Sequence, residues 1–224
     1  MSHNKNSEKV FPRVIFIGDS GVGKTSMILK VTTGVFDPSP ASTIGAGVRP
    51  ISVNAGNKQY HFHLWDTAGQ EIYRSIVPLY FKQAVCAVIV FSMTDYKSYQ
   101  NITDWINILA TNSDRNVPVV IVGNKMDLFT DIKIPESNES IDSQNNSSQQ
   151  LDSIPEIGEH QVVEIPAIKK FCEERNYPLF FTSALTGENI KTMFEFIAEN
   201  YVSPPNQKQE EVAQSQKDGS YGCC

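Results

Sequence analysis

The chain has 224 residues, of which 40% are hydrophobic and 10% aromatic, so it is long enough for one well-buried soluble domain with tails. No apolar run approaches the ~20 residues that a membrane-spanning helix needs, and residues 1–8 are too polar for a secretory signal, so the cytosol is the expected compartment. The net charge of −6 argues against a nucleic-acid binder.

The acidic excess lies in one segment. Residues 129–163 hold seven acidic residues and one lysine, and so account for the whole net charge. The centre of this segment is rich in Ser, Asn and Gln and cannot bury enough apolar surface to order strongly. We therefore expect a flexible N-terminus over 1–10, one domain over 11–202 with a polar acidic insertion at about 130–160, and a flexible tail over 203–224.

The first part of the domain alternates between apolar runs and turn-forming residues. The elements that it predicts are, in order, a strand at 14–17, a helix carrying Met27, Ile28 and Val31, a loop at 37–50, and a hairpin with strands at 51–53 and 60–65. His61 and His63 alternate with apolar residues in the hairpin. A solvated strand face explains them better than a metal site, because no third ligand is in sight.

Apolar residues recur with helix or strand spacing along the rest of the domain. The predicted elements are, in order, a loop at 66–71, a short helix ending at Phe81, a strand at 85–91, an amphipathic helix with Tyr99, Ile102, Trp105, Ile106 and Leu109, a strand at 117–122, a helix at 165–174, a strand at 179–182 and a helix at 190–201. This alternation predicts an α/β fold with a mainly parallel sheet and helices on both faces. Cys86 and Cys172 lie in apolar patterns and are expected to be buried thiols.

The segment Gly18–Thr25 fits the pattern G-x-x-x-x-G-K-[ST] of a phosphate-binding loop, here called the P-loop. Its glycines let several backbone N–H groups converge on one anion, and the following helix directs its positive end at the same point. Lys24 adds a charge near the β/γ-phosphates, and the Thr25 hydroxyl is a ligand for the bridging Mg²⁺. These features predict a nucleotide site.

Four further motifs support the nucleotide site, because ligands bind where the strands of such a sheet end. Asp66 is suited to hold a Mg²⁺-bound water, the Gly69 N–H to reach a γ-phosphate, and Gln70 to orient an attacking water. Thr43 offers a second hydroxyl to Mg²⁺.

The other two motifs concern the base. In Asn124–Asp127 the final carboxylate is suited to accept two N–H bonds from guanine, which adenine cannot offer. In Thr182–Ala184 a backbone N–H is placed to meet the guanine carbonyl.

Together these motifs resemble those of the Ras superfamily of small GTPases, and within it the Rab family. The similarity covers about residues 11–128 and 164–201. It is carried by Gly18–Ser26, Thr43–Gly45, Lys58, Trp65–Glu71, Tyr73–Ile76, Tyr80–Ala84 and the terminal Cys-Cys. The resemblance implies a P-loop small G domain with a six-stranded sheet, which hydrolyses GTP to GDP and phosphate slowly with Mg²⁺ and is stimulated by a GTPase-activating protein.

The resemblance also implies the site residues. The catalytic ones would be Gln70, Lys24 and Thr43, and the Mg²⁺ ligands Thr25, Thr43 and, through water, Asp66. The GTP contacts would be Gly18, Asp19, Ser20, Gly21, Val22, Gly23, Lys24, Thr25, Ser26, Phe36, Thr43, Asp66, Gly69, Asn124, Lys125, Asp127, Ser183, Ala184 and Leu185.

The implied partners follow from the same resemblance. Loop 37–48 would be switch I and 66–81 switch II, and the exchange factor, activating protein, GDI or escort protein and effectors would bind a monomer through 37–50 and 66–81. Two motifs depart from the Rab pattern, namely Ile44–Val48, which Rabs usually have as Ile-Gly-Val-Asp-Phe, and Ser183–Leu185. Val48 stands where Rabs have an aromatic effector-facing residue, and Leu185 stands where they have lysine. The acidic insertion is not typical of Rabs either.

The tail carries its own signal. Stable membrane anchoring takes two attachments, and residues 203–222 have no polybasic patch to supply the second. Prenylation of both Cys223 and Cys224 would supply two lipid chains. We therefore expect a switch that regulates vesicle traffic from the cytoplasmic face of an intracellular membrane and cycles with the cytosol.

Three alternatives stay open from the sequence. One is a Ras-superfamily GTPase outside the Rab family, and another is a GTP-loaded scaffold with little hydrolysis. A P-loop ATPase is the third, and it is disfavoured because Asn124–Asp127 selects guanine.

Overall fold

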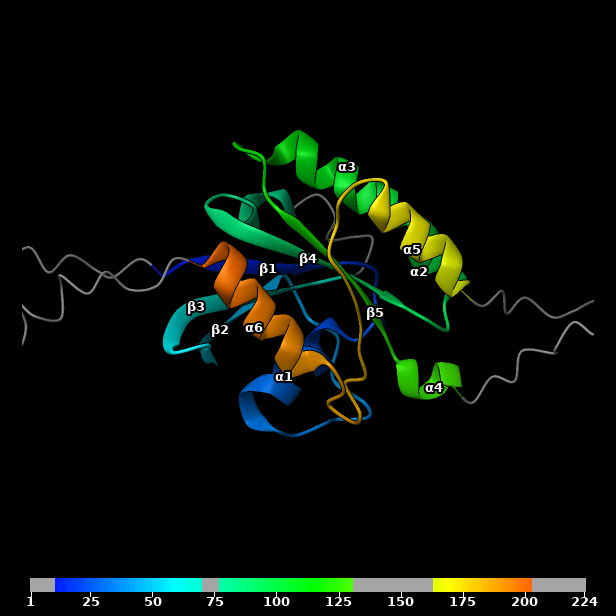
Figure 1. Ribbon diagram of the computed structural model, residues 1–224, viewed down its shortest axis with the longest axis horizontal. Helices are drawn as coiled ribbons and strands as arrows, with labels where there is room; N and C mark the ends of the chain where they lie inside the picture. The colour runs from blue at the N-terminus through cyan, green and yellow to red at the C-terminus, as the bar shows by residue number, and fades with distance from the viewer. Residues whose placement is uncertain (1–10, 70–76, 131–162, 203–224) are drawn as a thin grey trace, which may run out of the picture.

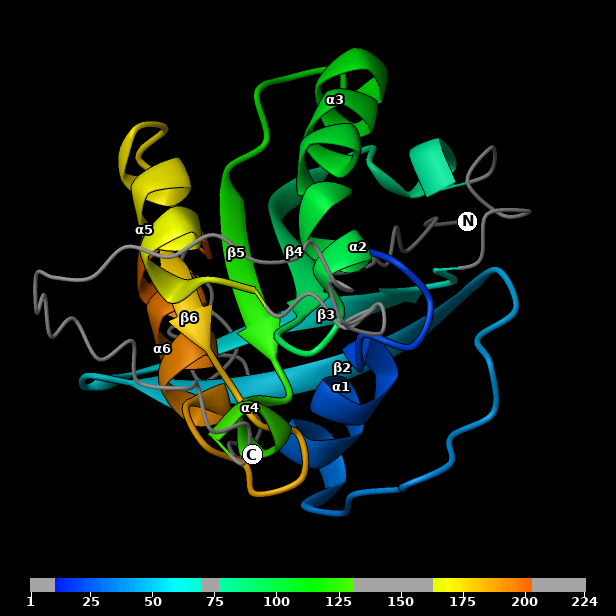
Figure 2. The ribbon, with the colours of Figure 1, turned by 90° about the vertical axis from the view of Figure 1, so that its right-hand side faces the viewer.

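A computed structural model of the chain describes residues 11–69, 77–130 and 163–202. Within these ranges six strands form one sheet in the order β2-β3-β1-β4-β5-β6 (Figure 1, with β6 labelled in Figure 2). Neighbouring strands run parallel except for β2 and β3, which form an antiparallel hairpin. The mainly parallel six-stranded sheet that the sequence predicts is confirmed.

The elements follow the expected order along the chain. The strands are β1 (Arg13–Ile17), β2 (Ala46–Ala55), β3 (Lys58–Thr67), β4 (Ala84–Ser92), β5 (Val119–Asn124) and β6 (Leu179–Phe181). The helices are α1 (Lys24–Thr33), the 3-10 helix η2 (Val77–Tyr80), α2 (Tyr96–Gln100), α3 (Ile102–Asn112), α4 (Met126–Thr130), α5 (Ile165–Glu173) and α6 (Ile190–Tyr201).

The sheet is covered by apolar side chains on both faces. In β1, Val14 and Phe16 belong to one core layer and Ile15 and Ile17 to the other, and none of the four is exposed. Helices α1 and α6 cover the first face, whereas α2, α3 and α5 cover the second (Figure 1). A strand can be apolar at every position only when both of its faces are covered in this way.

Strand β2 begins earlier than the sequence predicts. Residues 46–50, expected in the loop 37–50, pair with β3, and Pro50 lies opposite His63. The His63 N–H donates instead to the carbonyl of Pro12, at 2.9 Å, so the Pro50–His63 pair requires no hydrogen bond from the proline. The expectation was wrong because β2 is an edge strand, where a proline is tolerated.

The helices also differ from expectation. The single amphipathic helix expected around Trp105 is divided at Asn101, which ends α2 and begins α3. Helix α4 was not predicted, because five residues are too few to show periodicity. The short helix expected before Phe81 is the 3-10 helix η2, and residues 70–76 lie outside the described ranges.

The two hairpin histidines have protein neighbours. The Nδ1 atom of His61 is 2.8 Å from the Ser52 hydroxyl, and the His63 ring packs at a tilt against that of Phe11, with 5.0 Å between centroids. Across the described part of the chain, no three His, Cys, Asp or Glu side chains are grouped as a metal site. In the same part, no helix has the length and apolarity to cross a membrane.

The buried cysteines provide a test of the core. Cys86 is 0% and Cys172 2% exposed, and burial raises the pKa of both thiols, that of Cys172 to about 11. Because the thiolate is the reactive form, a Cys223→Ser/Cys224→Ser variant should react with a chromogenic disulfide reagent at pH 8 only after denaturation, and then with two thiols per chain. A thiol that reacts within minutes in the native protein would contradict this packing.

Candidate functional site

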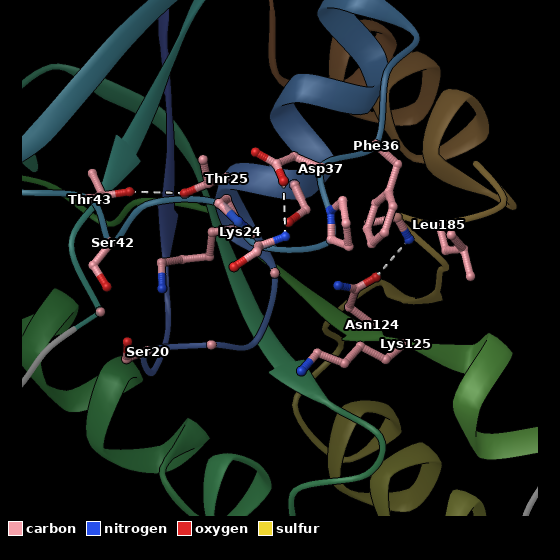
Figure 3. Close-up of a pocket in the computed structure, with 18 of the residues that line it drawn as sticks. Ser20, Lys24, Thr25, Phe36, Asp37, Ser42, Thr43, Asn124, Lys125 and Leu185 are labelled. Carbon is pink, nitrogen blue, oxygen red and sulfur yellow. Dashed lines mark hydrogen bonds between the residues drawn. The ribbon is translucent and has the colours of Figure 1, made fainter.

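A cavity of about 480 Å³ lies where the P-loop joins β1 to α1 and where β5 ends (Figure 3). It is lined by the P-loop, the loop after α1, the end of β3 with Gly69, the end of β5 with the segment after it, and the segment after β6. Figure 3 shows Lys24, Thr25 and Thr43 at one end of the cavity and Phe36, Lys125 and Leu185 at the other. The cavity therefore has one end with an ammonium group and hydroxyls, and another where the apolar side chains of Phe36 and Leu185 lie near Lys125.

The backbone of the P-loop requires glycine. Gly18, Gly21 and Gly23 have φ values of 138°, 76° and 99°, which favour glycine. A Cβ on Gly18 would lie 2.1 Å from the carbonyl oxygen of Val90 in β4. The loop thus passes close to the neighbouring strand and then enters α1, whose first residue is Lys24.

The Lys24 ammonium is buried within its own loop. Its side chain is 5% exposed, and Nζ donates to the carbonyl oxygens of Gly18 at 2.8 Å and Asp19 at 2.7 Å. Burial lowers the pKa of Lys24 to about 8, although the Asp66 and Asp19 carboxylates oppose the shift. The lysine is therefore held ready for an anion, which would stabilise its charged form.

Two threonine hydroxyls meet one aspartate beside Lys24. Thr25 Oγ1 donates to Asp66 Oδ2 at 2.8 Å, and Thr43 Oγ1 lies 2.9 Å from Thr25 Oγ1 and 3.4 Å from the same carboxylate oxygen. Burial raises the pKa of Asp66. Its Oδ1 atom is buried without a hydrogen-bond partner among the described residues. Oxygen ligands with an unsatisfied buried carboxylate oxygen fit Mg²⁺.

Asn124 ties the two ends of the cavity together. It is 1% exposed, and its Nδ2 donates to the carbonyl of Val22 in the P-loop at 2.9 Å. Its Oδ1 accepts from the backbone N–H of Ala184 and from the Thr182 hydroxyl, both at 3.2 Å. The Asn124 amide is thus engaged in holding the P-loop against the loop that follows β6.

Asp127 is placed by the loop that follows β6. The Ser183 hydroxyl donates to Asp127 Oδ1. Lys125 has a left-handed backbone with φ of 67°, which turns the chain from β5 into α4 (Figure 2). Asp127 and Lys125 both line the cavity.

Most of the predicted contacts line the cavity. Those that line it are Ser20, Gly21, Gly23, Lys24, Thr25, Ser26, Phe36, Thr43, Gly69, Asn124, Lys125, Asp127, Ala184 and Leu185. Five predicted residues are not among those that line it: Gly18, Asp19, Val22, Asp66 and Ser183. Gln70, Cys223 and Cys224 lie outside the described ranges.

Some lining residues were missed by sequence reasoning. Asp37, Ser39 and Ser42 line the cavity from the loop after α1. The Asp37 side chain accepts from the Ser39 N–H at 2.9 Å, which is an Asx turn. The Asp-Pro-Ser sequence was the available signal for this turn, but it gave no indication that the turn faces a ligand.

The amino-acid sequence is similar to a family model and to several known proteins. A sequence model of the Ras family matches residues 13–203. The Ras-related protein Rab-5B of Plasmodium falciparum (isolate 3D7) is 33% identical over 200 residues, which are 89% of this chain and 82% of that protein. The GTP-binding protein YPT53 of Saccharomyces cerevisiae is 31% identical over 192 residues, 86% of this chain and 77% of the relative. The GTP-binding protein ypt5 of Schizosaccharomyces pombe is 31% identical over 198 residues, which are 87% of this chain and 79% of that protein.

The role of Asn124 gives a testable result. Asn124→Ala removes three internal hydrogen bonds and leaves a buried carbonyl and N–H unpaired, so it should lower the free energy of unfolding by about 2–4 kcal/mol. The matched control is Asn200→Ala, whose amide bonds only the Phe196 carbonyl on an exposed helix surface and which should cost less than about 0.5 kcal/mol. Urea unfolding of both variants measures the difference, and equal losses would contradict the assigned role.

Proposed function

The chain belongs to the Rab branch of the Ras family of small GTPases, and from this premise we propose that it is a membrane-bound GTP/GDP switch that regulates intracellular vesicle traffic. The observation that carries the proposal is the convergence of the predicted phosphate, magnesium and base ligands on one cavity. They come from five separate stretches of sequence, so their meeting is a property of the fold and not of any one motif.

The geometry supports one orientation of GTP. Its phosphates would lie at the P-loop end with Lys24, and its guanine between Phe36 and the Lys125 and Leu185 side chains (Figure 3). The Asp127 carboxylate, steadied by Ser183, would accept N–H bonds from the base. The Ala184 N–H, which bonds Asn124 in this structure, would face the guanine carbonyl.

Thr25 and Thr43 would hold Mg²⁺ directly and Asp66 through water. When bound, the ion supplies charge neutralisation on the β/γ-phosphate oxygens. The three residues already form one hydrogen-bonded group, so little rearrangement of side chains is needed to present their oxygens to a cation.

We propose that hydrolysis relies on Gln70, which would position the attacking water. No arginine is among the residues described around the cavity, so unaided turnover should be slow. By analogy with Ras it would be of order 10⁻⁴ s⁻¹, raised up to ~10⁵-fold by an activating protein that supplies an arginine.

The switch would act through Thr43 and Gly69, which contact the γ-phosphate in the GTP state and lose that contact after hydrolysis. Regulators and effectors would bind over residues 37–50 and 66–81. In this area the rings of Trp65 and Tyr80 pack in a tilted arrangement with their centroids 5.6 Å apart, and Val48, which is 45% exposed, pairs with Trp65 across the hairpin. Valine offers less contact area than an aromatic residue, so effector choice should differ from that of Rabs with the aromatic residue.

Membrane attachment would come from prenyl groups on Cys223 and Cys224. The absence of a polybasic patch in residues 203–222 supports two lipid chains as the pair of anchoring signals. An escort protein would be needed to shield the two prenyl groups while the chain moves through the cytosol. The organelle would be set by partners and not by the lipids.

The base assignment is tested with Asp127→Asn. An amide cannot accept two N–H bonds from guanine but can pair with xanthine, so affinity for GTP should fall by roughly 100-fold or more and affinity for XTP should rise. Competition binding with GTP, XTP and ATP measures the shift, with Asp104→Asn on the exposed side of α3 as the control. Full preference for GTP over XTP in Asp127→Asn would rule out the guanine contact.

Hydrolysis is tested with Gln70→Leu. The variant should bind GTP normally and hydrolyse it at least about tenfold more slowly, because leucine cannot orient water. Single-turnover phosphate release measures the rate, and Gln59→Leu, an exposed glutamine on β3, is the matched control. A wild-type protein that binds GTP and hydrolyses none, even with candidate activating proteins, would favour the scaffold alternative.

A further inference from the structure

The carboxylate of Asp19 is turned away from the cavity and toward α3. Its Oδ2 accepts a hydrogen bond from Asn101 Nδ2 at 2.6 Å, and its Oδ1 accepts one from Trp105 Nε1 at 2.8 Å. A carboxylate aimed at the cavity would repel phosphates, so this orientation removes an unfavourable charge from the site. Figure 2 shows the P-loop passing beside the junction of α2 and α3.

The two donors are firmly placed. Asn101 is both the C-cap of α2 and the N-cap of α3. Its carbonyl oxygen accepts a hydrogen bond from the Trp105 N–H at 3.1 Å. One helical turn separates the two residues, so their side chains lie on the same side of the helix. Trp105 is 1% exposed and packs in the core layer beneath α3. The positions of the two donors are therefore fixed by core packing and by the junction of the two helices.

The backbone of Asp19 contacts two parts of the phosphate site. Its carbonyl oxygen accepts from Lys24 Nζ at 2.7 Å. The same oxygen would lie 2.4 Å from a Cβ on Gly69, so the switch II glycine passes directly against it. The place of Asp19 therefore determines where the Lys24 ammonium rests and how closely Gly69 approaches.

We propose that Asn101 and Trp105 are positioning residues for the P-loop, which hold Asp19 so that nucleotide phosphates are bound in a ready-made cradle. A preformed cradle spends no binding energy on ordering the loop, so it slows nucleotide release. The inference rests on the proposed function, because it concerns the retention of GDP and GTP in that site. It gives α3, which lines none of the cavity, a part in nucleotide retention.

The first test compares two conservative core variants of the full chain. Trp105→Phe keeps an aromatic ring and removes the N–H donor, whereas Ile102→Val shortens a side chain that is 1% exposed on the same helix. A fluorescent GDP analogue, displaced by excess GDP in the presence of Mg²⁺, reports the dissociation rate. We expect Trp105→Phe to release it about tenfold faster, from the loss of a hydrogen bond to a charged group, and Ile102→Val to change the rate less than about twofold.

The second test is a rescue. Asn101→Asp places a carboxylate against that of Asp19, and it removes no capping hydrogen bond from α3, because the Asn101 side chain makes none. Release should be at least about tenfold faster. Adding Asp19→Asn restores a donor and an acceptor in exchanged positions, and should return the rate to within about threefold of wild type.

Several results would overturn the inference. These are wild-type release rates in Trp105→Phe and Asn101→Asp, equal acceleration by Ile102→Val, or no rescue by Asp19→Asn. Each of these would leave the proposed function intact, because the wild-type chain would still bind GDP. A wild-type chain that binds no guanine nucleotide would overturn the proposed function and this inference together.

Discussion

The buried ammonium group of Lys24 is the interaction on which the rest of the site depends. Burying a charged lysine is costly unless hydrogen bonds or opposite charges compensate, and here the compensating groups are main-chain carbonyl oxygens of its own loop with Asp66 and Asp19 nearby. This arrangement fixes the P-loop as a closed turn around the lysine. It also leaves the outward side of the ammonium as the natural place for an anion.

That turn is held from two sides by side chains far away in the sequence. Asn124 holds it at Val22 from the end of β5, and the Asn101–Trp105 pair holds it at Asp19 from α3. The phosphate site is therefore supported by the core, while the surfaces that would change with the nucleotide, around Thr43 and Gly69, lie at its margin. Such a division between a rigid cradle and movable margins suits a switch, because release of the γ-phosphate can alter the margins without unfolding the cradle.

Val48 and Leu185, which depart from the Rab pattern, lie in different places relative to the cavity. Val48 lies on the edge strand β2 beside the Trp65–Tyr80 pair, away from the cavity. Leu185 lines the cavity, yet its carbonyl accepts from Lys30 at 3.1 Å, and the Ala184 N–H keeps its place through Asn124. The chemistry of the site is thus compatible with both replacements.

The sequence by itself determined the α/β architecture and the composition of the site, because apolar periodicity and short glycine-rich motifs are local properties. It also placed most lining residues, since motifs that follow parallel strands meet at one edge of the sheet. Only the tertiary structure decided that Pro50 belongs to a strand, because that depends on β2 lying at the sheet edge. Likewise, the Asp19 carboxylate bonds Asn101 at the start of α3, 82 residues away in the sequence. The Asn124 amide bonds the backbone carbonyl of Val22, 102 residues away. Such side-chain orientations follow from packing between distant elements, which no local pattern specifies.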